Sequence, residues 1–75
     1  MSIIMKEIIE LSKNLKILRT QYNLTQKEVA KKLEITYQSY QAYELGISIP
    51  SLQNFIKLAK IYDVSLDYLI GNEKY

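Results

Sequence analysis

The chain has 75 residues, the size of one small domain spanning residues 1–75. It contains no cysteine and no histidine, so we expect no disulfide, metal site, cofactor or enzyme activity, and a location in the reducing cytoplasm. The formal net charge is only +2, and no apolar run approaches the roughly 20 residues that a membrane span requires.

The first ten residues form an apolar amino-terminal extension. Its apolar side chains must be buried against another part of the protein or against a partner; they are Ile3, Ile4, Met5, Ile8 and Ile9. The segment also lacks the small-residue cleavage site of a signal peptide. Two arrangements meet this need: a first helix that runs from about residue 3 to residue 22, or a separate arm that folds over the domain or a second subunit. We favour a helix or arm that contributes to dimer contacts over packing within one chain.

A short helix is predicted to begin after Thr25. Thr25 can cap the amide of Glu28, while Glu28 can reach back to the amide of Thr25. Leu24 can pack on Val29 across the start of the helix. This combination of a capping box and a hydrophobic staple is a specific signal for a helix start.

A second helix start follows after a turn of three residues, 33–35. Ile35 and Tyr40 repeat the staple around Thr36 as the cap, with Ser39 in place of the glutamate of a capping box. Helices this short are unstable alone, so the two must share a core. The expected core residues are Val29, Ala30, Leu33, Ile35, Tyr40 and Tyr43. This pattern is typical of a helix-turn-helix, which makes DNA reading the leading hypothesis.

Helix geometry divides the second helix into two faces. Positions 37, 38, 41, 42 and 45 fall on an outward arc, and positions 39, 40 and 43 fall on the opposite arc. Gln38 and Gln41 can each match the N6 and N7 edge of adenine, and Ala42 can contact a thymine methyl group. Tyr37 can touch a base or a phosphate. The alternative interpretation is an ordinary solvated face.

The remaining chain is predicted to supply scaffold. Gly46 begins a loop whose backbone amides and Ser48 are candidates for phosphate contacts. A scaffold helix is indicated by the helical spacing of Leu52, Phe55, Ile56, Ala59 and Tyr62. A last short helix follows a cap at Ser65, and residues 72–75 are expected to form a frayed tail. Asp63 is interpreted as part of the approach to that helix.

Basic residues gather in the middle of the chain. Residues 11–60 contain Lys13, Lys16, Arg19, Lys27, Lys31, Lys32, Lys57 and Lys60. The acidic residues there are Glu28, Glu34 and Glu44. This basic segment would attract the phosphates of DNA. The alternative is a solvated lysine face, which is also common in proteins that bind no nucleic acid.

Taken together, the ordered motifs resemble the lambdoid phage repressor and Cro family of helix-turn-helix proteins, often called XRE-type. The resemblance covers about residues 12 to 71. It is carried by Gln26, Val29, Ala30, Leu33, Ile35, Thr36, Tyr43, Glu44, Gly46, Pro50 and the run from Asp63 to Leu69. It implies an all-α, compact five-helix, lambda-repressor-like DNA-binding domain.

The resemblance also implies roles for individual residues. Gln26 matches a residue that contacts phosphate and supports the recognition helix, and Arg19 and Glu44 match an internal salt bridge. Tyr37, Gln38 and Ala42 match base-contacting positions, and Ser39 and Gln41 match plausible backbone contacts. The complete set of expected DNA-binding residues is Gln26, Lys27, Thr36, Tyr37, Gln38, Ser39, Gln41, Ala42 and Ser48.

Three positions depart from the family pattern. Glu34 stands where glycine is usual, and a non-glycine residue forced to positive φ costs on the order of 1 kcal/mol. Asn23 replaces a glycine at the end of the first helix, where asparagine is well tolerated. Leu45 is apolar on the outward arc and has no assigned role.

The expected function is a sequence-specific transcriptional regulator, acting as a repressor. A homodimer would bind double-stranded DNA at a palindromic operator, with recognition helices in successive major grooves. No small-molecule effector and no membrane partner are expected. The alternative is a protein-interaction module, such as an antitoxin, that docks a partner through the apolar amino-terminal segment.

Overall fold

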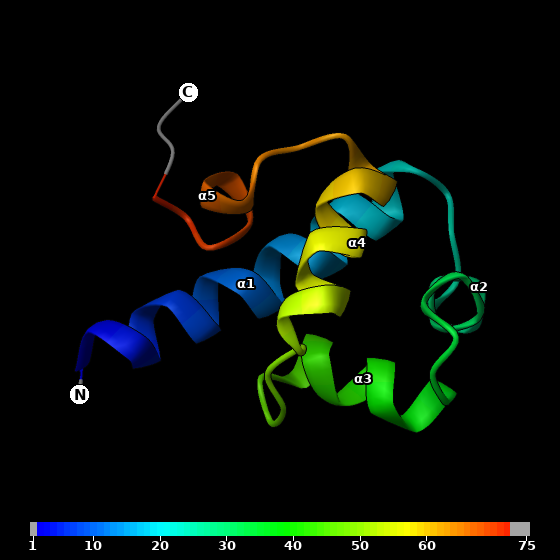
Figure 1. Ribbon diagram of the computed structural model, residues 1–75, viewed down its shortest axis with the longest axis horizontal. Helices are drawn as coiled ribbons and strands as arrows, with labels where there is room; N and C mark the ends of the chain where they lie inside the picture. Colours follow the sequence, from blue (N-terminus) through cyan, green and yellow to red (C-terminus); the bar gives the residue numbers. More distant parts are fainter. Residues whose placement is uncertain (1, 73–75) are drawn as a thin grey trace.

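The computed structural model describes residues 2–72, with side chains from Met5 onward, and contains five helices in this range (Figure 1). The helices are α1 (Ser2–Gln21), α2 (Gln26–Leu33), α3 (Tyr37–Leu45), α4 (Leu52–Tyr62) and α5 (Leu66–Leu69). No strand occurs among these residues, so the expected all-α, five-helix fold is confirmed. The predictions for the side chains of Ile3 and Ile4, and for the tail at 73–75, lie outside the described residues.

The amino-terminal extension continues the first helix. Of the two arrangements considered, α1 adopts the extended helix and not a separate arm. Leu11, Leu15 and Leu18 form its buried stripe, because residues three and four apart share one face of a helix. Asn14 Nδ2 donates to the carbonyl oxygens of Tyr68 and Leu69 at 3.2 and 3.1 Å, which attaches α1 to α5.

Each of the other four helices begins at a serine or threonine cap. The hydroxyls of Thr25, Thr36, Ser51 and Ser65 each accept a hydrogen bond from the amide three residues later. The capping box at Thr25 is complete, since the Thr25 amide also donates to Glu28 Oε1 at 2.7 Å. The predicted starts of α2, α3 and α5 are therefore confirmed.

The core lies where α2 and α3 pack against α1 and α4. Its members include five of the six residues expected for the helix-turn-helix, namely Val29, Ala30, Leu33, Tyr40 and Tyr43. The sixth, Ile35, is half-buried and packs against this core. The rings of Tyr40 and Tyr43 meet edge to face with centroids 6.0 Å apart, a favourable geometry for aromatic pairs.

The predicted scaffold helix is present as α4, and its apolar residues are buried to different degrees. Leu52 is 70% exposed and Ile56 is 38% exposed, so the first turn and outer flank of α4 lie outside the core. The buried residues of this helix are Leu58, Ala59 and Tyr62, and the helical spacing had not singled out Leu58. Periodicity identified an apolar helix, but only tertiary packing determines how far the core extends along it.

Three non-glycine residues have left-handed backbone conformations. Asn23 and Glu34 have φ values of 57° and 59°, as expected from the glycines they replace in the family pattern. Asp63, with φ of 53°, is the carboxyl-terminal cap of α4 and not merely an approach to α5. Asparagine and aspartate tolerate this conformation better than glutamate does, so strain is concentrated at Glu34.

We expect Glu34→Gly to stabilise the fold on the order of 1 kcal/mol, because glycine removes the Cβ contact of the left-handed conformation. Chemical unfolding monitored by circular dichroism measures this effect. Glu34→Ala is the matched control: it removes the same charge and keeps the Cβ. Equal stabilisation by the two substitutions would show that charge, and not backbone conformation, limits this turn.

Candidate nucleic-acid interface

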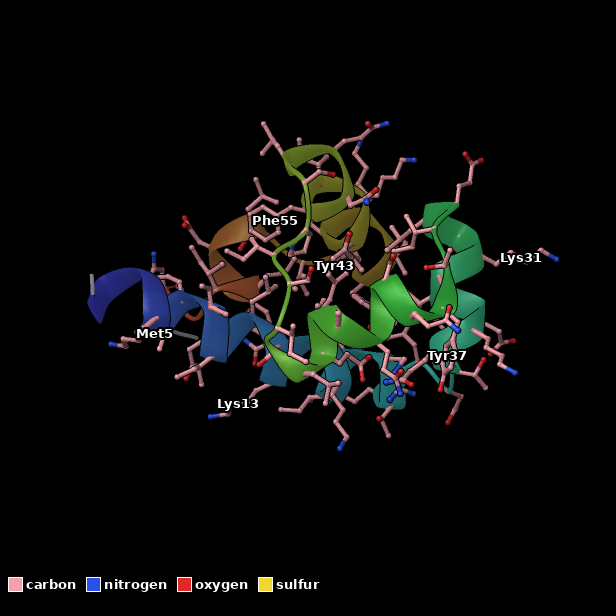
Figure 2. The ribbon with its side chains drawn as sticks, turned by 90° about the horizontal axis from the view of Figure 1, so that it is seen from below. Met5, Lys13, Lys31, Tyr37, Tyr43 and Phe55 are labelled. Carbon is pink, nitrogen blue, oxygen red and sulfur yellow. The ribbon has the colours of Figure 1, made fainter. Side chains whose placement is uncertain are left out.

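Helices α2 and α3 are joined by a hydrogen-bonded turn. The Glu34 amide donates to the carbonyl oxygen of Lys31, and the Ile35 amide donates to that of Ala30, each at 3.0 Å. Thr36 then starts α3 in a new direction. Figure 1 shows α3 along one edge of the molecule, and Figure 2 looks onto it, with Lys13 of α1 and Lys31 of α2 on either side.

The outward arc of α3 is accessible in varying degree. Gln38 is exposed, whereas Tyr37, Gln41 and Ala42 are half-buried, and all four lie away from the core tyrosines. Leu45 is 65% exposed, and no contact in the structure explains its apolar side chain. The arc therefore presents one free glutamine amide near the start of the helix, where a recognition helix contacts bases.

Ser39 lies on the arc opposite to Gln38 and is exposed. The Ser39 amide donates to Thr36 Oγ1 at 3.1 Å, and Thr36 Oγ1 donates to Ser39 Oγ at 2.8 Å. Thr36 thus has a structural role as the cap, while its exposed position leaves it at the edge of the interface.

Tyr37 lies between two polar side chains. The Lys27 ammonium group sits 5.5 Å from the centroid of the Tyr37 ring, within the range of a cation–π contact. On the other side, Gln41 Nε2 is 3.5 Å from Tyr37 Oη, which is a weak hydrogen bond. These contacts hold Lys27, Tyr37 and Gln41 together across α2 and α3.

A polar hollow of about 370 Å³ adjoins this group. It is lined by Arg19, Leu24, Thr25, Gln26, Lys27 and Tyr37. Its position at the amino-terminal end of α2 and the charge of exposed Lys27 suit an anion such as a backbone phosphate.

The Glu44 carboxylate accepts hydrogen bonds from residues of α1, α2 and α3. Arg19 Nε donates to Glu44 Oε2 at 2.7 Å, and Arg19 Nη2 donates to Oε1 at 3.2 Å. Tyr40 Oη also donates to Oε2, at 2.5 Å, and Gln26 Nε2 donates to Oε1 at 2.9 Å. The Glu44 side chain is 3% exposed, so one buried carboxylate joins α1, α2 and α3.

Arg19 makes three hydrogen bonds inside the protein. Besides its two bonds to Glu44, its Nη1 donates to the carbonyl oxygen of Leu24 at 2.9 Å. The hydrogen bond to Glu44 raises the pKa of Arg19. Arg19 is therefore a structural residue beside the interface and not a free cation for DNA.

Gln26 also forms a hydrogen bond inside the protein, to Glu44. Its amide nitrogen bonds Glu44, so α2 supports α3 through this pair, as the family resemblance implied for this position. Its contact with phosphate remains a prediction. Sequence reasoning missed the bonds of Gln26 and Tyr40 to Glu44; the only signal was that a buried carboxylate and a buried phenol need partners.

The loop after α3 differs from its expected role in one respect. The amides of Ile47 and Ser48 both donate to the carbonyl oxygen of Ala42, at 3.0 and 3.3 Å. These amides close the end of α3, so the expectation that they are open for phosphate contact is wrong. The Ser48 side chain is exposed and remains a candidate.

Two carboxylates in this region have lowered pKa values. Burial alone would raise the pKa of Glu44, but the hydrogen bonds from Arg19, Tyr40 and Gln26 outweigh it and lower the pKa below 4.5. The capping bonds with the backbone and side chain of Thr25 lower the pKa of exposed Glu28. Burial disfavours the charged phenolate in the same way and raises the pKa of Tyr40 and Tyr62.

These directions predict a loss of stability in acid. A carboxylate whose pKa is lower in the folded chain stabilises it above the unfolded value of about 4.5, and this stabilisation is lost as pH falls through the folded pKa. Urea unfolding at several pH values should therefore show a free energy of unfolding that is steady near neutrality and decreases below about pH 4.5. Glu44→Gln should flatten this decrease, and an equally steep decrease in that variant would contradict the assignment.

Residues 2–72 contain no group of three or more acidic side chains placed to hold a metal ion. Within the same range, no helix combines the length and apolar character needed to cross a membrane.

Comparison with known proteins gives consistent matches. A family profile described as helix-turn-helix matches residues 15–69. The chain is 50% identical over 62 residues to the HTH-type transcriptional regulator YqaE of Bacillus subtilis, covering 83% of this chain and 53% of that protein. It is 39% identical over 64 residues to the HTH-type transcriptional regulator ImmR of the same organism, covering 85% of this chain and 50% of ImmR.

A third relative is the cryptic phage CTXphi transcriptional repressor RstR of Vibrio cholerae serotype O1. It is 36% identical over 53 residues, which cover 71% of this chain and 47% of RstR. The chain thus spans about half the length of these relatives. No solved structure matches it significantly.

Proposed function

Because the chain belongs to the helix-turn-helix family of the lambdoid repressor and Cro type, we propose that it is a DNA-binding transcriptional regulator whose α3 enters the major groove. The observation that carries this proposal is the outward arc of α3, with exposed Gln38 at its start and lysines of α1 and α2 on either side (Figure 2). Base-reading amides next to phosphate-binding cations are what sequence-specific recognition requires.

In this proposal Gln38 reads a base edge, and Tyr37 and Ala42 contact bases beside it. Gln41 and Ser39 contact the DNA backbone from the flanks of α3, with Thr36 at its edge. A second group of phosphate contacts comes from Gln26 and Lys27 at the polar hollow and from the exposed Ser48 side chain. The buried Glu44 and its partners fix the angle between α2 and α3, so both groups reach the same duplex.

The regulator is proposed to act as a homodimer on a palindromic operator. Two recognition helices would occupy major grooves about 34 Å apart. Repression would follow from occupancy of the site, in keeping with the name of the relative RstR as a transcriptional repressor.

The phosphate contacts can be tested with a charge-matched pair of variants. Lys27→Ala should weaken binding to operator and random duplex alike and reduce the slope of log K against log salt by about 0.9, because one phosphate contact is lost. Lys60→Ala removes the same charge from the last turn of α4 and should leave the slope unchanged. Fluorescence anisotropy from low to high salt measures both, and equal slopes for the two variants would contradict the assigned role of Lys27.

A protein-interaction module is the second candidate, and exposed apolar residues of α1 such as Ile9 favour it. The outward arc of α3 is open, however, and lysines flank it. An open arc with basic flanks is the arrangement expected of a DNA reader, so DNA binding is the better supported function.

A further inference from the structure

Leu45, the last residue of α3, has no role in the function proposed above. Its side chain is 65% exposed, while α3 packs on the core through Tyr40 and Tyr43. Single exposed leucines are common on protein surfaces, so exposure alone does not indicate a binding role. The informative feature of Leu45 is its position on the helix.

Leu45 lies almost in line with the glutamine that is proposed to read a base. At about 100° per residue, Leu45 is rotated by only about 20° from Gln38 and lies roughly 10 Å farther along the helix axis. Ala42 lies between them, rotated by about 40° from Gln38 in the other direction. Gln38, Ala42 and Leu45 therefore form one row along the outward arc, which we call the central stripe.

The central stripe changes from polar to apolar along its length. Gln38, near the amino end of α3, exposes an amide, whereas Ala42 and Leu45 carry no hydrogen-bonding group on their side chains. Residues three apart are neighbours on a helix surface, so Ala42 and Leu45 form one apolar patch. The first part of the stripe suits a polar base edge, and the second part suits an apolar group.

Cations lie at both ends of α3. In Figure 2, Lys13 of α1 lies at the end of α3 opposite to Tyr37. The two helices are close there, because a Cβ atom added to Gly46 would lie 3.6 Å from Ser12 Oγ. The Lys13 side chain is 61% exposed and its ion pair is 3.7 Å long, so its ammonium group can bind a phosphate. A duplex bound by Lys13 and by Lys27 near Tyr37 would cover the whole length of α3.

The length of α3 also allows both ends of the stripe to face bases. Its 9 residues span roughly 13 Å, close to the major-groove width of about 12 Å. The separation of Gln38 and Leu45 along the axis equals about three base-pair steps of roughly 3.4 Å. A base contact of Leu45 would therefore lie at most about three base pairs from that of Gln38.

The chemistry of the major groove indicates which group Leu45 would contact. Base edges there present hydrogen-bond donors and acceptors, and thymine adds an apolar methyl group at C5. Leucine placed against the polar edge of a G·C pair would remove water from that edge and return no hydrogen bond, which costs free energy. Leu45 therefore favours a thymine at its base step.

We infer that Leu45 is a specificity-determining residue that contacts the 5-methyl group of a thymine in the major groove. The inference rests on the proposed DNA-binding function and adds the chemistry of a second base step to it. Helix α3 then reads hydrogen-bonding groups with its amino half and a methyl group with its carboxyl end.

Parallel selections from a random duplex pool test this inference. The unmodified protein should enrich a sequence with a fixed thymine, at most about three base pairs from the position where Gln38→Ala loses its preference. Leu45→Ala should lose the preference for that thymine and keep the preferences at the other positions. Leu45→Met should keep the thymine, because methionine preserves an apolar side chain of similar volume.

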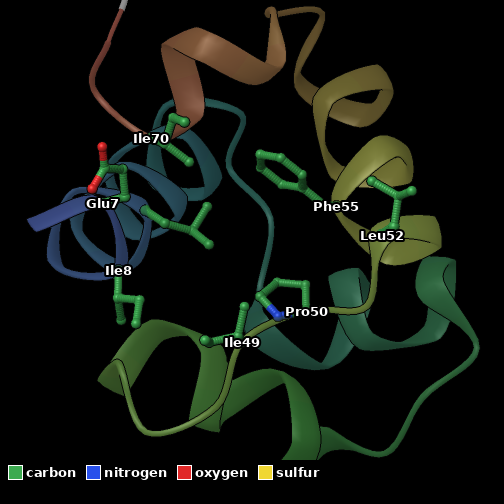
Figure 3. Close-up of a pocket in the computed structure, with 8 residues that line it drawn as sticks. Glu7, Ile8, Ile49, Pro50, Leu52, Phe55 and Ile70 are labelled. Atoms are coloured by element: carbon green, nitrogen blue, oxygen red, sulfur yellow. The ribbon is translucent and has the colours of Figure 1, made fainter. Parts of the chain in front are cut away.

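Leu52→Ala is the matched control for the selections. Leu52 is 70% exposed, close to the value for Leu45, so the two substitutions remove the same atoms from similar surroundings. In Figure 3, Leu52 lies on α4 at an apolar groove of about 350 Å³ whose lining also includes Phe55 and Ile8. This groove lies outside the outward arc, so Leu52→Ala should keep every base preference of the unmodified protein.

Deoxyuridine isolates the methyl contact and requires no variant, because uracil differs from thymine only by lacking the 5-methyl group. Replacing the fixed thymine of one half-site by uracil should weaken binding of the unmodified protein about fourfold, the effect of burying one methyl group. Leu45→Ala should bind the thymine and uracil duplexes equally. Fluorescence anisotropy measures the four affinities.

The outcomes separate this inference from the proposed function. Equal binding of the two duplexes by the unmodified protein, or a thymine preference that persists in Leu45→Ala, would overturn the inference and leave DNA binding intact. Weaker binding of Leu45→Ala without any effect of uracil would instead identify a sugar contact and also overturn it. Enrichment of no sequence by the unmodified protein would reject the proposed function and this inference together.

Discussion

Arg19→Ala is expected to lower the free energy of unfolding by about 3–5 kcal/mol, because it leaves the buried Glu44 carboxylate without its charged partner. The side chains of Arg19 and Glu44 are 15% and 3% exposed, so the carboxylate left behind is poorly hydrated. A chain of 75 residues has a total stability of roughly 4–11 kcal/mol. Thermal unfolding should therefore show a melting temperature at least about 12 °C lower.

A second ion pair provides the matched control for this prediction. Lys13 Nζ and Glu10 Oε2 are 3.7 Å apart, and their side chains are 61% and 33% exposed. Lys13→Ala should change the free energy of unfolding by less than about 1 kcal/mol, because exposed ion pairs contribute little. A loss of similar size in Lys13→Ala and Arg19→Ala would contradict the role assigned to the Glu44 network.

The largest expected effect on DNA recognition is that of Gln38→Ala. Removing the glutamine amide should weaken binding to the preferred operator by about 1–3 kcal/mol and binding to random duplex only slightly. Gln38 is the exposed amide near the start of α3, so its loss removes base contacts while the scaffold stays unchanged. Competition binding with operator and random duplex measures the two affinities in one experiment.

Gln21→Ala is the corresponding control, since Gln21 is an exposed glutamine at the end of α1. It should leave both affinities unchanged. If Gln38→Ala weakened operator and random duplex equally, Gln38 would be a backbone contact and another residue of the arc would read the bases.

Signals contained within a few residues predicted the local structure well. Thr25 and Thr36 marked the starts of α2 and α3, because a cap and its helix are adjacent in sequence. The positive φ at Glu34 was also predictable, because the family resemblance places a usual glycine at this position of the turn. The inward position of Tyr40 and Tyr43 followed from the 3.6-residue period of the helix.

Features that depend on distant parts of the chain were not predictable in the same way. The hydrogen bond from Gln26 to Glu44 joins residues 18 positions apart. It could not be predicted because the sequence pattern does not determine how α2 and α3 cross. Leu52 belongs to the apolar spacing of α4 and is nevertheless 70% exposed, so periodicity alone does not determine which apolar residues of a helix are buried. Base contacts depend in addition on how α3 sits in the groove of DNA, which the fold of one chain does not determine.

The most direct test of the account is a selection of bound sequences from a random duplex pool at about 150 mM salt, where specific affinity should exceed non-specific affinity by about a thousandfold or more. The expected result is an enriched palindrome with half-site centres about one helical turn apart. Failure of the well-folded protein to enrich any sequence would contradict sequence-specific DNA reading by α3.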